Sequence, residues 1–231
     1  MGYLIFKNVS TRQIPGIAIS KMPSHKRAAM RYTEYYVKGR DGALHIDEGY
    51  SNIELQATIV LLDARAETRQ MLNNWATGTG KLITSDDPSK AFKASVKREI
   101  KYTRVPGNKG YFDTAVINFD CDPYMYEADE SVIEYTATGT ISNPGTAVAI
   151  PLIEVRGSGN VSFTVGGQQV TVKSMSSGVP AYLDCENGYV YAQSGAMEMI
   201  GEFPEIPMGQ SQVVLGTNAT KLTLTPHWRW I

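Results

Sequence analysis

Apolar and polar side chains alternate along most of this chain with a period of two residues. The clearest example covers residues 53–61, in which apolar positions alternate with Glu54, Gln56 and Thr58. This period is typical of strands that bury one face. Similar stretches predict further strands at residues 3–9, 81–85, 91–104, 111–121 and 150–156. The pattern therefore indicates a mainly β fold.

Turn residues between the alternating stretches predict four hairpins. Gly39, Arg40, Asp41 and Gly42 separate strands expected at 33–38 and 43–47, because Asp-Gly accepts the positive φ of a tight turn. Three later hairpins are expected to pair residues 161–165 with 170–172, 181–184 with 189–192, and 211–215 with 221–225. Their turns contain Gly166-Gly167, Asn187-Gly188 and Gly216-Thr217-Asn218. Short strands at this spacing predict a sandwich or jelly roll for the second half.

One stretch has helical periodicity instead. Asp63 can cap a helix from residue 64 to about 76, which Gly78 and Gly80 would end. The side chains that fall on one face of this helix are Ala64, Thr68, Met71, Leu72 and Trp75. Because an apolar stripe on a helix normally faces the core, we expect Trp75 to anchor the core rather than to bind a ligand.

Turn-forming residues near the middle of the chain predict a boundary between two domains. Asp122-Pro123 is expected to end a strand, because proline has no N–H for a ladder. Asn143-Pro144-Gly145 predicts a turn, and Pro151 opens a new strand. The sequence before this region contains the helix, and the sequence after it contains strands only. We therefore predict an α+β domain at residues 1–130 and an all-β sandwich at residues 131–231.

Composition narrows the class of protein. The chain has 231 residues, of which 42% are hydrophobic and 19% charged, so it can bury a core. Its net charge of -1 gives no long-range attraction to nucleic acid or to an anionic membrane. Residues 1–16 resemble neither a signal peptide nor a membrane span. Cys121 and Cys185 are too few for a disulfide framework, and we expect both to be small core residues.

The sequence lacks the motifs of common catalytic, metal and phosphate sites. His25, His45 and His227 are far apart, and no Cys-x-x-Cys, Gly-x-Ser-x-Gly or Walker loop is present. Two carboxylate pairs, Asp86-Asp87 and Asp120/Asp122, could serve a glycosidase, but turn and strand-end positions favour a solvated role. We therefore expect no enzyme activity, no cofactor and no bound metal.

A basic cluster lies between residues 97 and 109 and could follow the phosphates of a nucleic acid. It contains Lys97, Arg98, Lys101, Arg104 and Lys109, with Tyr102 among them. Glu99 interrupts the cluster, and no nucleic-acid-binding motif accompanies it. A solvated strand face or a subunit contact is the favoured interpretation.

Several segments, in this order and spacing, resemble the distal tail protein (Dit) family of siphovirus-type, long-tailed phages. The resemblance extends over essentially the whole chain. The segments are YYVKGRDGAL at 35–44, GKLITSDDPSKAFKA at 80–94, FDCDPYMYE at 119–127, ISNPGTAVAIPLIEVRGSGNVSFTV at 141–165, FPEIPMGQS at 203–211 and LTPHWRWI at 224–231.

This resemblance implies a structural protein of a phage or prophage virion. The N-terminal domain would be a tail-tube-like β-sandwich with one helix and a long hairpin, and six copies would form a ring around a channel for DNA. The C-terminal domain would be a galectin-like or carbohydrate-module-like sandwich. The ring would join the tail tube to the tail tip or baseplate after assembly in the bacterial cytoplasm, without entering a membrane.

The resemblance also implies partners. Besides the other copies of the chain, these are the tail tube protein, the tape-measure protein, and the tail-associated lysin or receptor-binding proteins of the tip. No specific recognition of nucleic acid is implied. The turn of Gly39, Arg40, Asp41 and Gly42 is the candidate for contact with the adjacent subunit or the tube.

A carbohydrate-binding module that attaches a phage to its host is the alternative interpretation. Tyr182, Tyr189 and Tyr191 lie around a predicted hairpin and could stack on sugar rings. Aromatic residues are also common in ordinary strands, so packing within the sheet competes with this interpretation.

Overall fold

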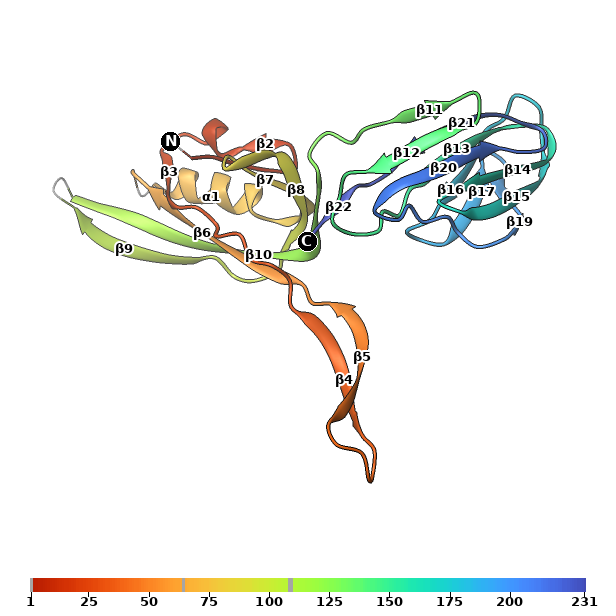
Figure 1. Ribbon diagram of the computed structural model, residues 1–231. Coiled ribbons are helices and arrows are strands. Elements are labelled where there is room, and N and C mark those ends of the chain that lie inside the picture. The colour runs from red at the N-terminus through yellow and green to blue at the C-terminus, as the bar shows by residue number, and fades with distance from the viewer. Residues whose placement is uncertain (1, 64, 108–109) are drawn as a thin grey trace. The chain divides into compact units, whose positions relative to one another are not determined.

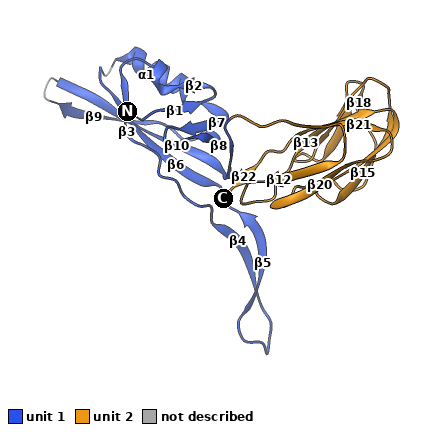
Figure 2. Cartoon of the chain, turned by 45° about the horizontal axis from the view of Figure 1, so that its top comes forward, with its two compact units in different colours: residues 1–128, 231 blue, residues 129–230 orange. Residues whose placement is uncertain are grey.

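The computed structural model describes residues 2–63, 65–107 and 110–231. These residues form a mainly β fold with one α-helix, as the alternating pattern predicts (Figure 1). The chain divides into two units, unit 1 with residues 1–128 and 231 and unit 2 with residues 129–230 (Figure 2). That the regions 1–130 and 131–231 are independently stable domains stays a prediction.

Unit 1 is built on one antiparallel sheet with the strand order β2-β1-β7-β8-β10-β6-β3. An additional strand, β9, pairs with the beginning of β10. The strands are β1 (Leu4–Phe6), β2 (Val9–Ser10), β3 (Ile17–Lys21), β6 (Ile53–Leu61), β7 (Gly78–Thr84), β8 (Asp87–Val96), β9 (Lys101–Gly107) and β10 (Gly110–Glu127). A short 3-10 helix, η1 (Thr11–Gln13), follows β2. Two further strands, β4 (Met30–Tyr36) and β5 (Ala43–Tyr50), pair only with each other among the described residues.

The helix α1 (Ala66–Trp75) contributes its buried side chains to the core of unit 1. The Trp75 ring meets Phe6 and Phe119 edge-on, with ring centroids 6.0 and 6.2 Å away. Its indole N–H donates to the Val9 carbonyl at 2.8 Å, so the polar atom is satisfied inside the core. The prediction that Trp75 anchors the core is therefore confirmed.

The start and the apolar face of the helix differ from the prediction. Arg65 occupies the N-cap position, whereas Asp63 accepts hydrogen bonds from the Arg65 N–H at 3.3 Å and from the Thr68 hydroxyl at 3.2 Å. Ala64, the predicted first residue, lies outside the described residues. Met71 was predicted on the buried face, but it is 47% exposed because the core contacts fall on Thr68, Leu72 and Trp75.

Three predicted strands of unit 1 have different limits. The stretch 3–9 is two strands, β1 and β2, because Lys7 and Asn8 adopt positive φ and reverse the chain. The stretch 91–104 is divided between β8 and β9. Strand β10 does not end at Pro123, since its pairing with β8 shifts register between Cys121 and Met125. This irregularity accommodates a residue that has no ladder donor.

Unit 2 is a sandwich of two antiparallel sheets. One sheet has the order β11-β21-β13-β16-β17-β18 and the other β12-β20-β14-β15-β19. The first contains β11 (Ile133–Tyr135), β13 (Leu152–Gly157), β16 (Ala181–Asp184), β17 (Tyr189–Ala192), β18 (Gly195–Ala196) and β21 (Ala219–Thr225). The second contains β12 (Gly139–Asn143), β14 (Gly159–Val165), β15 (Gln168–Met175), β19 (Met199–Ile200) and β20 (Gly209–Leu215). The last strand, β22 (Arg229–Trp230), belongs to neither of these two sheets. Both sheets contribute to one buried cluster, which includes Phe163, Leu183 and Trp228.

Two of the three hairpins predicted in unit 2 are confirmed, and one is wrong. Strands β14 and β15 pair across Gly166-Gly167, and β16 pairs with β17. Strands β20 and β21 were predicted to pair, but they belong to opposite sheets. The connection through residues 216–218 therefore crosses the sandwich instead of closing a hairpin. The galectin-like identity of this sandwich stays a prediction.

Candidate interaction surfaces

The ribbon of β4 and β5, drawn in orange in Figure 1, exposes an unusual number of large apolar side chains. Tyr36 is 78% exposed, and the least exposed of the set, Leu44, is 40% exposed. The full set is Met30, Tyr32, Tyr35, Tyr36, Val37, Leu44 and Ile46. Large apolar side chains that gather on an exposed surface often mark a site of interaction with another macromolecule.

The register of the ribbon separates two faces. Tyr35 lies opposite Leu44, and Thr33 lies opposite Ile46. Because alternate residues of a strand share a face, these four side chains form one surface, here called the apolar hairpin face. Apart from the Thr33 hydroxyl, which donates to the Glu48 carboxylate, its side chains are apolar or aromatic.

The opposite face of the ribbon mixes aromatic and polar side chains that contact one another. The Tyr36 hydroxyl donates to the Glu34 carboxylate at 2.9 Å, and His45 Nδ1 lies 3.7 Å from the same carboxylate. The Tyr32 ring meets the His45 ring edge-on with centroids 5.1 Å apart. On the apolar hairpin face, the corresponding polar contact is the hydrogen bond from Thr33 to Glu48.

The predicted contact residues Gly39, Arg40, Asp41 and Gly42 lie at the tip of this ribbon. The loop is longer than predicted, because β4 ends at Tyr36 and six residues precede β5. Gly39 and Gly42 adopt φ of +84° and +75°, which only glycine takes without strain. The Arg40 N–H donates to the Val37 carbonyl at 3.1 Å and closes the turn. Contact of these residues with a partner stays a prediction.

The three tyrosines singled out in the sequence come together on β16 and β17. The rings of Tyr182 and Tyr191 are stacked, with centroids 5.3 Å apart and planes 22° apart. The Tyr189 ring lies 5.3 Å from Tyr191 at 34°. The intervening residues Leu183 and Val190 are buried in the sandwich, so the tyrosines face away from its core. Sugar binding by this cluster stays a prediction.

Two of the four candidate catalytic carboxylates, Asp87 and Asp120, make structural contacts. Asp87 accepts from the Ser89 backbone N–H at 3.3 Å and hydroxyl at 2.6 Å, which is turn chemistry. Asp120 contacts Lys97 Nζ at 2.8 Å and the Asn52 amide at 3.1 Å. Chiefly because of the Lys97 hydrogen bond, the pKa of Asp120 is lowered. A glycosidase acid needs a raised pKa, so Asp120 is tuned in the opposite direction.

Each described cation of the basic cluster contacts a neighbouring carboxylate. Lys97 contacts Asp120 at 2.8 Å, Arg98 contacts Glu54 at 2.9 Å, and Lys101 contacts Glu99 at 3.4 Å. Arg104 lies 3.2 Å from Asp113, while Lys109 lies outside the described residues. A surface whose cations are paired in this way offers little net charge to a phosphate backbone.

The two cysteines and the potential metal ligands are the remaining chemical candidates. Burial raises the pKa of the Cys121 and Cys185 thiols to about 12, so both are poor nucleophiles. Within the described ranges, no group of three or more potential metal ligands comes together. No helix among the described residues is long and apolar enough to cross a membrane.

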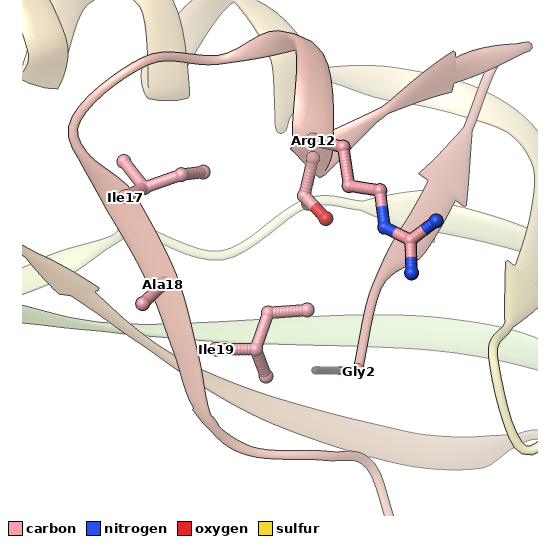
Figure 3. Close-up of a pocket in the computed structure, with 6 residues that line it drawn as sticks. Gly2, Arg12, Ile17, Ala18 and Ile19 are labelled. Atoms are coloured by element: carbon pink, nitrogen blue, oxygen red, sulfur yellow. The ribbon is translucent and has the colours of Figure 1, made fainter.

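A shallow cavity lies between η1 and β3 (Figure 3). Its lining residues are Gly2, Thr11, Arg12, Ile17, Ala18 and Ile19. Its volume of about 80 Å³ is far below the roughly 300–1,000 Å³ of small-molecule sites. At the edge of this cavity, the Arg12 guanidinium lies over the Tyr3 ring, 4.2 Å from its centroid.

Solved structures of two phage tail proteins are similar to this chain in fold. No protein-family model and no curated protein sequence matches the chain. The Dit protein of phage SPP1, described as a paradigm of the hub adsorption apparatus in phages that infect Gram-positive bacteria, matches over 100% of both chains with a TM-score of 0.76 and 15% identity. A chain of the phage P2 baseplate in its activated conformation with Ca matches over 96% of both chains, with a TM-score of 0.51 and 10% identity. The chain therefore has the fold of a phage distal tail protein of the Dit type.

Proposed function

We propose that the chain is a structural protein of a phage or prophage tail tip. Six copies form a ring through residues 1–130, and the ring joins the tail tube to the tip or baseplate and anchors tip proteins. The observation that carries this proposal is the likeness to SPP1 Dit along the whole of both chains, because it includes both units and the long ribbon.

The apolar hairpin face supports an assembled state. A two-stranded ribbon is at best marginally stable alone, and Tyr35, Leu44 and Ile46 remain exposed in the single chain. A neighbouring copy or the tail tube would remove these side chains from water. A ring requires a heterologous contact that closes by rotation, and a reaching ribbon supplies such a contact. A stable contact of this type buries on the order of 1,600 Å².

The chemistry of the chain supports a non-catalytic role. The thiols are held protonated by burial, and Asp120 is held ionised by Lys97. The proposed partners are therefore proteins: further copies of this chain, the tail tube and tape-measure proteins, and the tail-associated lysin or receptor-binding proteins. DNA would pass through the channel without sequence recognition, and assembly would take place in the bacterial cytoplasm.

Electron microscopy of tails tests this function. A tag fused to the C-terminal end of the chain is labelled with gold, and the purified protein at high concentration is imaged by negative stain. The expected result is label at the tail tip together with sixfold rings. Label elsewhere on the virion, or rings of another symmetry, would overturn the proposal.

A further inference from the structure

A buried carboxylate joins the hairpin of β9 and β10 to the helix of unit 1. Asp113 of β10 accepts from Arg69 Nε of α1 at 2.8 Å and from Arg104 Nε of β9 at 3.2 Å. The Asp113 side chain is buried, whereas the Arg104 side chain is 59% exposed. Two guanidinium groups therefore share one carboxylate, and two positive charges with one negative charge leave a net charge of +1.

The outer end of Arg104 has donors to offer to a ligand. Among the described residues, the Asp113 carboxylate is the only acceptor that contacts the Arg104 guanidinium, and it contacts Nε. The N–H groups on Nη1 and Nη2 therefore have no acceptor in the described chain. Because Asp113 holds Nε, less side-chain entropy is lost when this planar pair of nitrogens binds a ligand. Two such donors match the two oxygens of a carboxylate.

An open cavity of about 320 Å³ lies beside this group. It is lined by Arg69, Tyr102, Arg104 and Asp113. The Tyr102 hydroxyl donates to the Asn73 side-chain oxygen at 2.7 Å, so its proton is not offered to a ligand. A carboxylate with one negative charge balances the net charge of the group and accepts from Nη1 and Nη2 of Arg104.

An exposed aromatic side chain extends this surface along the hairpin. Arg104 lies opposite Asp113, and Pro106 lies opposite Tyr111. Because alternate residues of a strand share a face, Tyr111 and Pro106 lie on the same side of the hairpin as Arg104. Tyr111 is 67% exposed and Pro106 is exposed as well, and the hairpin extends beyond α1 (Figure 1). Arginine and tyrosine side by side are typical of the anchors of a protein interface.

We propose that Arg104, Tyr111 and Pro106 form a docking site for a partner protein that presents an aspartate or glutamate beside an apolar residue. The partner carboxylate accepts from Nη1 and Nη2 of Arg104, and the apolar residue covers the Tyr111 ring. A nucleic acid needs a row of cations, whereas the neighbouring Lys97 and Arg98 each contact a carboxylate of their own. The site goes beyond the proposed function, because it requires neither a ring nor a particular symmetry.

Titration of the purified full chain, followed by NMR of the arginine Nε–H signals, tests the site. The probes are the N-acetylated, C-amidated dipeptides glutamyl-phenylalanine and glutaminyl-phenylalanine, together with acetate and dimethyl phosphate. The expected result is a saturable shift of the Arg104 signal, with the glutamyl peptide bound roughly three- to tenfold more tightly than the glutaminyl peptide. Acetate and dimethyl phosphate should bind more weakly than the glutamyl peptide, because neither contacts Tyr111.

Three results would overturn the proposal. The first is equal binding of the two peptides, or no saturable shift with the glutamyl peptide. The second is acetate binding as tight as that of the glutamyl peptide, which would indicate a site for free carboxylates. The third is tightest binding of dimethyl phosphate, which would indicate a nucleic-acid contact. None of these results bears on the location of the chain in the virion, which the gold label tests separately.

Variants assign the contact to its residues. Arg104→Gln should weaken binding of the glutamyl peptide roughly three- to tenfold, and Arg104→Lys should restore only part of it, because it keeps the charge but not the planar pair of donors. Asp113 keeps its contact with Arg69 in both variants, so unit 1 should still fold. Tyr111→Ala should weaken peptide binding about two- to threefold and leave acetate binding unchanged.

Arg98→Gln is the matched control. Arg98 is 67% exposed, but its Nη1 already contacts Glu54 at 2.9 Å, so this variant should bind the glutamyl peptide as the parent does. Unchanged binding by folded Arg104→Gln, or equal losses in Arg104→Gln and Arg98→Gln, would contradict the site.

Discussion

Two hairpins of the chain follow the same alternating pattern but have different surroundings. In the hairpin of β14 and β15, Val161, Phe163 and Val172 are at most 1% exposed. In the hairpin of β4 and β5, the large apolar side chains are 40–78% exposed. Both turns contain glycines with positive φ, so local backbone geometry does not distinguish the two hairpins.

The difference lies in what covers the apolar face. The sandwich of unit 2 places a second sheet over β14 and β15, and the resulting burial accounts for their apolar residues. Among the described residues, no further strand pairs with β4 or β5. Burial within the chain therefore explains one apolar face, whereas the contact proposed above with a second protein would explain the other.

The largest expected effect is on the covered hairpin. Phe163→Ala should lower the free energy of unfolding of unit 2 by about 3–5 kcal/mol, because it removes a fully buried ring and leaves a cavity. Tyr35→Ala on the apolar hairpin face is the matched variant and should change stability by no more than about 0.5 kcal/mol. Denaturant unfolding monitored by tryptophan fluorescence measures both. Equal losses in the two variants would remove the distinction between the hairpins.

Replacing a turn glycine should also cost more stability in the covered hairpin than in the exposed one. A Cβ at Gly166 would lie 1.9 Å from the Glu205 carbonyl oxygen, and φ there is +62°. Gly166→Ala should therefore cost unit 2 more than about 2 kcal/mol, since backbone strain and a backbone clash add together. Thermal unfolding of the purified variant measures this loss. A variant as stable as the parent would contradict this prediction, because it would show that the backbone at Glu205 can move away from the added Cβ at little cost.

A third hairpin, formed by β9 and β10, is held to the rest of unit 1 by polar contacts. Asp113 is 3% exposed and contacts Arg69 of α1 at 2.6 Å and Arg104 of β9 at 3.2 Å. Burial would raise the pKa of Asp113, but hydrogen bonds from both arginines outweigh burial and lower it. Asp113→Asn should therefore cost unit 1 about 1–3 kcal/mol at neutral pH.

The contribution of Asp113 to the free energy of unfolding should depend on pH in a definite direction. The pKa of an unfolded aspartate is about 3.9, so the contribution of Asp113 is present above that value and is lost as the pH falls through the lowered folded pKa. The stability difference between parent and Asp113→Asn should shrink below about pH 4. Denaturant unfolding of both proteins at a series of pH values measures this stability difference. A difference that grows on acidification would contradict the assignment.

The smallest expected effect is local to the exposed ribbon. Gly42 adopts φ +75°, and a Cβ there would meet nothing within 4 Å. Gly42→Ala should weaken the ribbon by roughly 1–2 kcal/mol through left-handed strain alone, without changing the unfolding of either unit. Hydrogen exchange of the β4 and β5 amides measures this change. Slower exchange, or a lower melting temperature of unit 1, would contradict the independence of the ribbon.

Sequence patterns predicted those elements whose local signal agrees with their burial. The alternation at 53–61 and the helical stripe around Trp75 coincide with buried faces, and Gly166-Gly167 closes a hairpin as expected. The patterns failed where tertiary context decided. Strand β10 continues past Pro123 through an irregularity, and residues 216–218 cross between sheets although their composition is typical of a hairpin turn.

For the candidate surfaces too, the sequence predicted which residues lie together but not whether they are covered. The pairing of β16 with β17 brings Tyr182 and Tyr191 together, and the spacing of the predicted hairpin indicated this proximity. The apolar hairpin face was missed, because periodicity shows which residues share a face but not whether anything covers that face. The available signal was the apolar content of residues 30–37, where aromatic and aliphatic side chains occupy both faces of a short strand.

Photo-cross-linking tests most directly the claim that the apolar hairpin face is an intermolecular contact. Benzoylphenylalanine replaces Tyr35 in the full chain, and assembled tails are irradiated and analysed by mass spectrometry. Replacement of Tyr189, on the outer face of unit 2, is the control. The account predicts that position 35 cross-links to a second copy of the chain or to the tail tube, and that position 189 forms neither product. Tails that assemble normally while position 35 reacts only within its own chain would contradict the account.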